Sequence, residues 1–168
     1  LRCIMCSVWR AGERGNNPDF YNELSTDRIF SLLGELKKLG TKRLHFSGGE
    51  PLLRKDLFEI MIHAKELDMS LVINTNGTLI SRRIAEKLVD SGVQEVIISI
   101  DSANPEIHDE IRGRKGAWRK AIEGMTNLDI VRKELDSPLK IRINSLLMSL
   151  NYKTVDEIMD LKGIVDFD

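Results

Sequence analysis

The stretch "KRLHFSGGEP", residues 42–51, decides the fold of this sequence. Its first residues have the pattern of a short β-strand and run directly into the pair Gly48-Gly49, after which a helical pattern of apolar residues covers 55–68. Another helical pattern, over 26–39, precedes the strand and stops at Gly40. A strand set between two helices is typical of a βα unit in a parallel sheet.

The same alternation continues along the rest of the chain. Ser81 can cap a helix that runs to Val89, a long helix is expected over 117–135, and a shorter one near 154–161. Because helices separate the strands, we predict one α/β domain over 1–168, with parallel strands in a barrel or a doubly wound sheet. The other expected strands are SLVINTNG (70–77), QEVIISID (94–101) and LKIRINSLLM (139–148), and GIVDFD (163–168) starts a further one.

One face of each expected strand becomes polar toward its carboxyl end. Strands of a parallel sheet that is covered on both faces are apolar throughout, whereas side chains that alternate in polarity put their polar members on one face. We interpret this face as the interior of a barrel that binds a polar ligand at the carboxyl ends of its strands. Alternatively, these groups only pair with one another. The polar positions are His45, Ser47, Asn74, Asn76, Ser99, Asp101, Arg142 and Asn144.

Composition and charge exclude several classes of partner. The chain has 25 basic and 26 acidic residues, so its formal net charge of −1 favours neither nucleic acid nor an anionic membrane as a partner. No apolar run approaches the roughly 18 residues of a membrane span, and no signal peptide is visible. The charge balance therefore predicts no nucleic-acid or membrane partner and a small ligand. We also predict a cytoplasmic protein.

The cysteines of the chain are Cys3 and Cys6, in Cys-x-x-Cys spacing. A disulfide between them would close only a very short loop, so a metal or redox role, or two inert thiols, is expected instead. A zinc site would need four ligands. The sequence offers no second cysteine pair, and its histidines are scattered at His45, His63 and His108.

Six short motifs occur in a fixed order along the chain: Cys3-Ile4-Met5-Cys6, Gly48-Gly49-Glu50-Pro51, TNG (75–77), ISIDS (98–102), IHDEIRG (107–113) and IRIN (141–144). This ordered set resembles the radical S-adenosylmethionine (SAM) superfamily, in the branch that contains the molybdenum-cofactor GTP cyclase and the SPASM-type maturases. The resemblance implies a partial (β/α)₆ TIM-like barrel with parallel strands, here lacking its first strand and the end of the domain.

The resemblance also implies the cofactors. The family's cluster motif is Cys-x-x-x-Cys-x-x-Cys; Cys3 and Cys6 match its second and third cysteines, so we expect the first one outside this chain. Three thiolates leave one iron of a [4Fe–4S] cluster open for SAM. The implied enzyme cleaves SAM reductively to a 5′-deoxyadenosyl radical that modifies a peptide or a cofactor precursor, with electrons from a flavodoxin or ferredoxin. The alternative is a non-catalytic α/β-barrel module that binds a small ligand and has lost the cluster.

Individual positions follow from the same resemblance. Gly48, Gly49 and Glu50 match the turn that binds the methionine amino group of SAM, and Met5 replaces an aromatic residue that borders the adenine. Ser99 matches a residue that reaches the ribose or carboxylate of SAM. The other implied SAM-binding positions are Asp101, on the same strand face as Ser99, and Asn144, on the strand that borders the adenine.

Two positions concern the substrate, and no residue is assigned a catalytic role. His45 stands where the GTP cyclase has a triphosphate-binding arginine, which argues against GTP because an imidazole replaces a forked, permanent cation poorly. It is either a substrate contact or a structural histidine. Arg142 takes the place of a substrate-contacting lysine, so an anionic group on the substrate is possible. Arg112 either orients SAM or pairs with Asp109.

Overall fold

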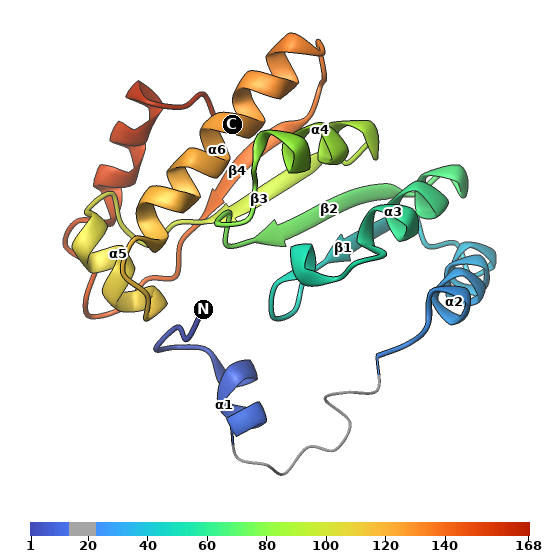
Figure 1. The fold of residues 1–168 in the computed structure, drawn as a ribbon, viewed down its shortest axis with the longest axis horizontal. Helices are drawn as coiled ribbons and strands as arrows, with labels where there is room; N and C mark the ends of the chain where they lie inside the picture. Colours follow the sequence, from blue (N-terminus) through green and yellow to red (C-terminus); the bar gives the residue numbers. More distant parts are fainter. Residues whose placement is uncertain (14–22) are drawn as a thin grey trace.

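The computed structural model describes residues 1–13 and 23–168 (Figure 1). Its centre is one sheet of four parallel strands in the spatial order β1-β2-β3-β4. Each strand therefore lies beside its neighbours in sequence, as in a barrel, whereas the strand order of a doubly wound sheet reverses at a switch point. The strands are β1 (Arg43–Phe46), β2 (Ser70–Thr75), β3 (Glu95–Ser99) and β4 (Lys140–Asn144).

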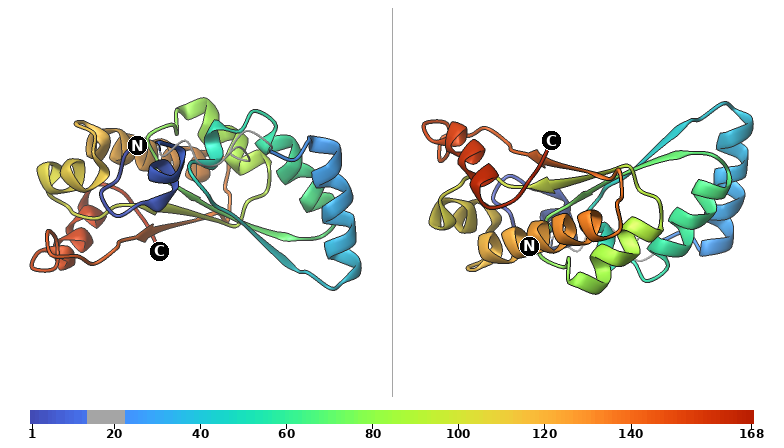
Figure 2. Two further views of the ribbon diagram at one scale, coloured as in Figure 1. Left: turned by 90° about the horizontal axis from the view of Figure 1, so that it is seen from below. Right: turned by 90° about the horizontal axis from the view of Figure 1, so that it is seen from above.

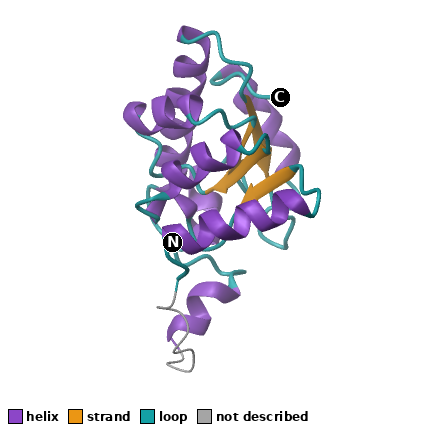
Figure 3. Ribbon diagram, turned by 90° about the vertical axis from the view of Figure 1, so that its right-hand side faces the viewer, coloured by secondary structure: helices purple, strands orange, loops and turns teal. Residues whose placement is uncertain are grey.

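Helices α3, α4 and α6 connect the strands and cover one face of the sheet (Figure 2). Figure 3 shows the strands among the helices from the side. The four helices predicted from apolar spacing before and between the strands are confirmed. Ser81 caps α4 as expected, because its side chain accepts the N–H of Ile84. The four confirmed helices are α2 (Thr26–Lys38), α3 (Leu57–Glu66), α4 (Arg82–Asp90) and α6 (Ala117–Glu134).

Three elements depart from expectation. α5 (Pro105–Arg112) forms over a segment that the sequence analysis read only as a motif. Its signals were present: the Asn104 side chain accepts the N–H groups of Glu106 and Ile107, and Pro105 opens the helix. The helix expected near 154–161 is instead a 3₁₀ helix, η3 (Val155–Gly163). The remaining short elements are α1 (Ser7–Glu13), which was not predicted, and η2 (Pro51–Leu53).

The core lies between the helices and the apolar face of the strands. Leu71, Ile73, Val96, Ile98 and Ile141 from the strands are fully buried against the helices. The opposite face carries the polar residues, as the alternation predicts. One of the predicted alternatives also holds locally: His45 Nε2 and Asn74 Oδ1 on this face lie 2.9 Å apart, within hydrogen-bonding distance.

The last residues run along the free edge of β4. The Asp168 N–H donates to the carbonyl of Ile141 at 2.8 Å, and its Oδ2 accepts the Ile141 N–H at 3.1 Å. Val165 and Phe167 are buried. The segment predicted to start a further strand thus lies beside β4, although no strand is assigned to it. No helix within the described ranges is long and apolar enough to cross a membrane.

Candidate functional site

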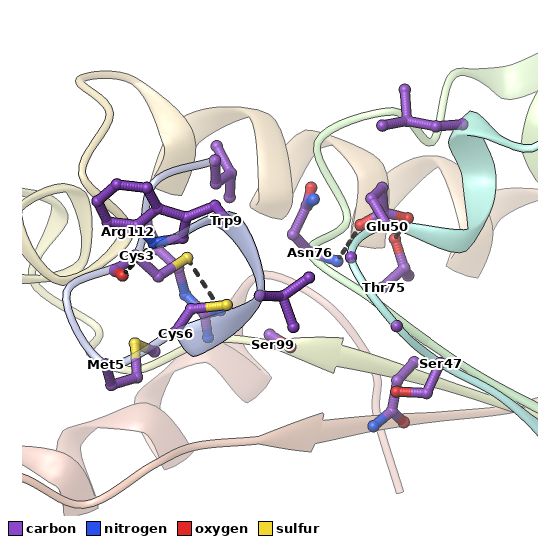
Figure 4. Close-up of a pocket in the computed structure, with 16 residues that line it drawn as sticks. Cys3, Met5, Cys6, Trp9, Ser47, Glu50, Thr75, Asn76, Ser99 and Arg112 are labelled. Carbon is purple, nitrogen blue, oxygen red and sulfur yellow. Dashed lines mark hydrogen bonds between the residues drawn. The ribbon is translucent and has the colours of Figure 1, made fainter. Parts of the chain in front are cut away.

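A cavity of about 380 Å³ opens at the carboxyl ends of β1, β2 and β3, under the N-terminal segment (Figure 4). Parallel strands bring these ends to one edge of the sheet, so residues distant in sequence meet there. Most of the predicted cluster and SAM-binding residues line this cavity. They are Cys3, Met5, Cys6, Gly48, Gly49, Glu50 and Ser99.

The turn after β1 is built around the Glu50 carboxylate. Its Oε1 accepts the N–H of Leu52 at 3.2 Å and the hydroxyl of Thr75 at 2.8 Å, and its Oε2 accepts the N–H of Asn76 at 2.9 Å. Glu50 thus ties this turn to the end of β2. An ionised carboxylate can accept about four hydrogen bonds, so one acceptor position remains for a cationic ligand.

The glycine pair gives this turn an open backbone. Gly48 has a φ of 130°, a region that residues with a Cβ rarely adopt. A Cβ built on either Gly48 or Gly49 would meet no atom within 4 Å. The peptide groups of the turn are therefore reachable by a ligand in the cavity.

Both cysteines are free thiols and belong to one tight turn. The N–H of Cys6 donates to the carbonyl of Cys3 at 3.1 Å, and the indole N–H of Trp9 donates to the same carbonyl at 2.8 Å. Figure 4 shows the two sulfur atoms on the same side of this turn, across the cavity from Glu50. We refer to residues 3–6 as the cysteine turn.

The carboxyl end of α5 supports the cysteine turn. The N–H of Ile4 donates to the carbonyl of Ile111 at 2.9 Å. Gly113, with a φ of 64°, lies against Arg2, the residue before the cysteine turn. A Cβ at Gly113 would stand 2.3 Å from the carbonyl oxygen of Arg2. This close approach requires a glycine.

Other predicted residues lie outside the cavity lining. Asp101 is fully buried below it, with Oδ2 2.7 Å from Nε of Arg112. Asn144 is exposed and pairs in register with Ser99. His45 and Arg142 lie nearer the middle of the polar sheet face, where Arg142 Nε is 3.8 Å from Glu95 Oε2.

The expected pairing of Arg112 with Asp109 is wrong. The carboxylate of Asp109 accepts the backbone N–H groups of Gly116 and Trp118 and so caps the start of α6. Arg112 instead turns toward the cavity, which it lines. Sequence analysis also missed the role of Thr75 as a partner of Glu50, although the motif TNG at 75–77 marked its position.

His108 lies behind the site and is buried. Its Nδ1 accepts the N–H of Asp101 at 3.2 Å. Burial, reinforced by the nearby positive charge of Arg112, lowers the pKa of His108 from 6.5 to about 4, while Asp109 partly opposes the shift. The imidazole is therefore neutral near pH 7, which suits its role as an acceptor.

Comparison with known proteins identifies the family of this chain. The model of the family described as the radical SAM superfamily matches residues 1–161. Fe-coproporphyrin III synthase of Methanosarcina barkeri is 35% identical, over 96% of this chain and 37% of its own length. PqqA peptide cyclase of Rhodopseudomonas palustris is 35% identical, over 100% of this chain and 42% of its own. The chain thus spans less than half of either relative.

A solved structure shows the fold. Native anSMEcpe with bound AdoMet has a TM-score of 0.73 to this chain at 20% identity, covering 97% of this chain and 45% of its own. This likeness in fold agrees with the predicted barrel-like α/β architecture.

Gly113→Ala tests the support of the cysteine turn by α5. Gly116→Ala is the matched control, because Gly116 also has a positive φ but open space around it. Strain alone should cost each variant about 1–2 kcal/mol of unfolding free energy. Gly113→Ala should cost more and should expose the buried Cys3 to alkylation by iodoacetamide, as measured by mass spectrometry. Equal stability and equal Cys3 labelling in the two variants would contradict the proposed contact.

A pH dependence of stability follows from His108. Between pH 6.5 and about 4 the unfolded chain binds a proton that the folded chain does not, so the unfolding free energy falls as the pH is lowered through this window. The full loss amounts to about 3 kcal/mol. Urea unfolding at pH 7 and pH 4.5 should show a steeper fall for the parent and for His63→Gln than for His108→Gln. A parallel fall in all three proteins would refute the assignment.

Proposed function

This chain belongs to the radical SAM superfamily, and we propose that residues 1–168 are a partial core domain of an enzyme that uses a [4Fe–4S] cluster and SAM to modify a peptide or a cofactor precursor. One observation carries the proposal. Two free thiols of one turn, an open glycine backbone and the Glu50 carboxylate line the same cavity.

The donor set fits an iron–sulfur cluster. Thiolates are the ligands that such clusters prefer, and Cys3 and Cys6 lie on one turn whose backbone is fixed by two hydrogen bonds. Within residues 1–13 and 23–168, no three His, Cys, Asp or Glu side chains gather to hold a metal ion. The proposal therefore needs a third thiolate, which the family motif puts four positions before Cys3.

The opposite wall of the cavity fits SAM. The exposed peptide groups of Gly48 and Gly49 can approach the methionine moiety, and the free acceptor position of Glu50 can take its ammonium group. Met5 and Ser99 border the same space. A bound cluster would supply the electron for reductive cleavage of SAM, and SAM would supply the radical chemistry that modifies the substrate.

The polar sheet face supports an anionic substrate group. Arg43 and Arg142 share the single carboxylate of Glu95, at 3.1 and 3.8 Å, so the arrangement keeps an excess of positive charge. The His45 imidazole adds a polar contact on the same face. We propose His45 and Arg142 as substrate contacts. A peptide or a cofactor precursor is consistent with the names of the two relatives, a PqqA peptide cyclase and an Fe-coproporphyrin III synthase.

The remaining partners follow from the same chemistry. A low-potential electron donor such as a flavodoxin or ferredoxin would reduce the cluster. A cytoplasmic location suits two free cysteines, because thiols stay reduced there.

Replacing either cysteine tests the proposed function. In the full-length protein, reconstituted without oxygen, Cys3→Ala and Cys6→Ala should each lose the stable cluster and form no 5′-deoxyadenosine with SAM and dithionite, because no neighbouring group can replace the thiolate. Iron analysis and chromatography of the products measure both effects.

Ser7→Ala is the matched control, since Ser7 follows Cys6 directly and is exposed. It should retain iron and 5′-deoxyadenosine formation at the parent level. A cysteine variant that cleaves SAM at the parent rate would show that the cluster ligands are assigned incorrectly.

A further inference from the structure

Arg112, the last residue of α5, is a buried cation at the cysteine turn. Its Nη1 lies 4.0 Å from the sulfur of Cys3, the contact that Figure 4 marks with a dashed line, and only 9% of the residue is exposed. Arg112 and Cys3 are 109 positions apart in sequence, so this contact depends on the support of the cysteine turn by α5.

The guanidinium is held from behind by Asp101. Asp101 Oδ2 lies 2.7 Å from Arg112 Nε, while Oδ1 accepts the N–H of Leu146 at 3.1 Å. The backbone of Asp101 is fixed as well, by His108 Nδ1 and by the side-chain amide of Asn151, which donates to its carbonyl at 2.7 Å. The carboxylate therefore meets the guanidinium at Nε, as an ion pair without hydrogen-bond alignment, while Nη1 lies 4.0 Å from the sulfur.

A buried ion pair is costly to form, and removal of one partner leaves an uncompensated charge. Apolar residues of similar size would fill the same volume at lower desolvation cost. The position of this pair beside a thiol that serves as a ligand in the proposed function gives it a purpose beyond packing.

We propose that Arg112 raises the reduction potential of the cluster that Cys3 helps to ligate, and that Asp101 is the positioning residue that aims its guanidinium at the Cys3 sulfur. This inference rests on the proposed function. It adds a residue outside the cluster motif and outside the Gly-Gly-Glu turn to the redox chemistry of the site.

Electrostatics determines the direction in which Arg112 shifts the reduction potential. Reduction takes one electron from an external one-electron donor and makes or breaks no bond, so the cluster and its thiolates become more negative by one charge. A permanent cation about 4 Å from one thiolate stabilises the reduced form more than the oxidised form, and strongly so where water is excluded. Asp101 weakens this effect, but its carboxylate meets Nε whereas the sulfur meets Nη1. Hydrogen bonds to the sulfurs and burial are known determinants of cluster potential.

The test measures the midpoint potential of the reconstituted full-length protein without SAM, by redox titration monitored by electron paramagnetic resonance. Arg112→Met alone would strand the Asp101 charge, so the informative variant is the double substitution Asp101→Asn with Arg112→Met. Arg112→Lys keeps the positive charge opposite Asp101 but loses the planar, forked set of guanidinium N–H donors. Arg114→Gln removes an exposed arginine two residues further on and is the control.

At full iron content, the double variant should have a lower potential by roughly a tenfold change in the reduction equilibrium, about 59 mV for one electron. Arg112→Lys should fall by less, and Arg114→Gln should match the parent. An unchanged potential in both the double variant and Arg112→Lys overturns the inference. If the potential holds while SAM binds more weakly, Arg112 is a SAM contact instead.

Different results would contradict the proposed function and the role of Arg112. A parent protein that takes up no low-potential cluster contradicts the proposed function itself. A parent with a normal cluster, whose potential does not respond to Arg112, contradicts only this inference. If the double variant does not fold, the more conservative neutral pair Asp101→Asn with Arg112→Gln decides the outcome, because Arg112→Lys keeps the charge that is being tested.

Discussion

The contact between the cysteine turn and the carboxyl end of α5 determines where the thiols of this chain lie. The hydrogen bond from the Ile4 N–H to the Ile111 carbonyl holds the turn against the end of α5. Because Gly113 has no side chain, the backbone before Cys3 can approach this helix end closely. The same helix end supplies Arg112. The parallel strands provide the opposite wall, because Glu50 joins the turn after β1 to the end of β2. A cavity with thiols on one side and a carboxylate on the other is the result.

Asp101 connects the two halves of this arrangement. It follows β3, pairs with Arg112 of α5, and bonds to the segment after β4 through the Leu146 N–H and the Asn151 side chain. A change in the loop after β4 would therefore reach the cysteine turn through one buried carboxylate and one guanidinium. Asp101 therefore supports Arg112, which lines the cavity, while Asp101 itself is not among the lining residues.

The sequence predicts the features that local chemistry controls. Apolar spacing locates α2, α3, α4 and α6, and alternation along the strands separates the core side from the polar side that carries His45, Ser99 and Arg142. The sequence does not predict which group each charged side chain contacts. Asp109 stands three residues before Arg112 on one helix, so local reasoning pairs them, but the start of α6 takes the Asp109 carboxylate and leaves Arg112 for Asp101. Such choices depend on how helices and turns pack, which spacing along the chain does not contain.

In the proposed function, SAM binds in this cavity with its methionine end on the cluster. Electron–nuclear double resonance of the reduced, reconstituted full-length protein tests it directly, with SAM carrying ¹⁵N in its amino group and ¹⁷O in its carboxylate. We expect hyperfine coupling of both labels to the cluster, because in the proposed function the Gly48-Gly49-Glu50 turn holds the methionine moiety across the same cavity from Cys3 and Cys6. A reduced cluster that binds SAM but shows no coupling to either label would contradict it.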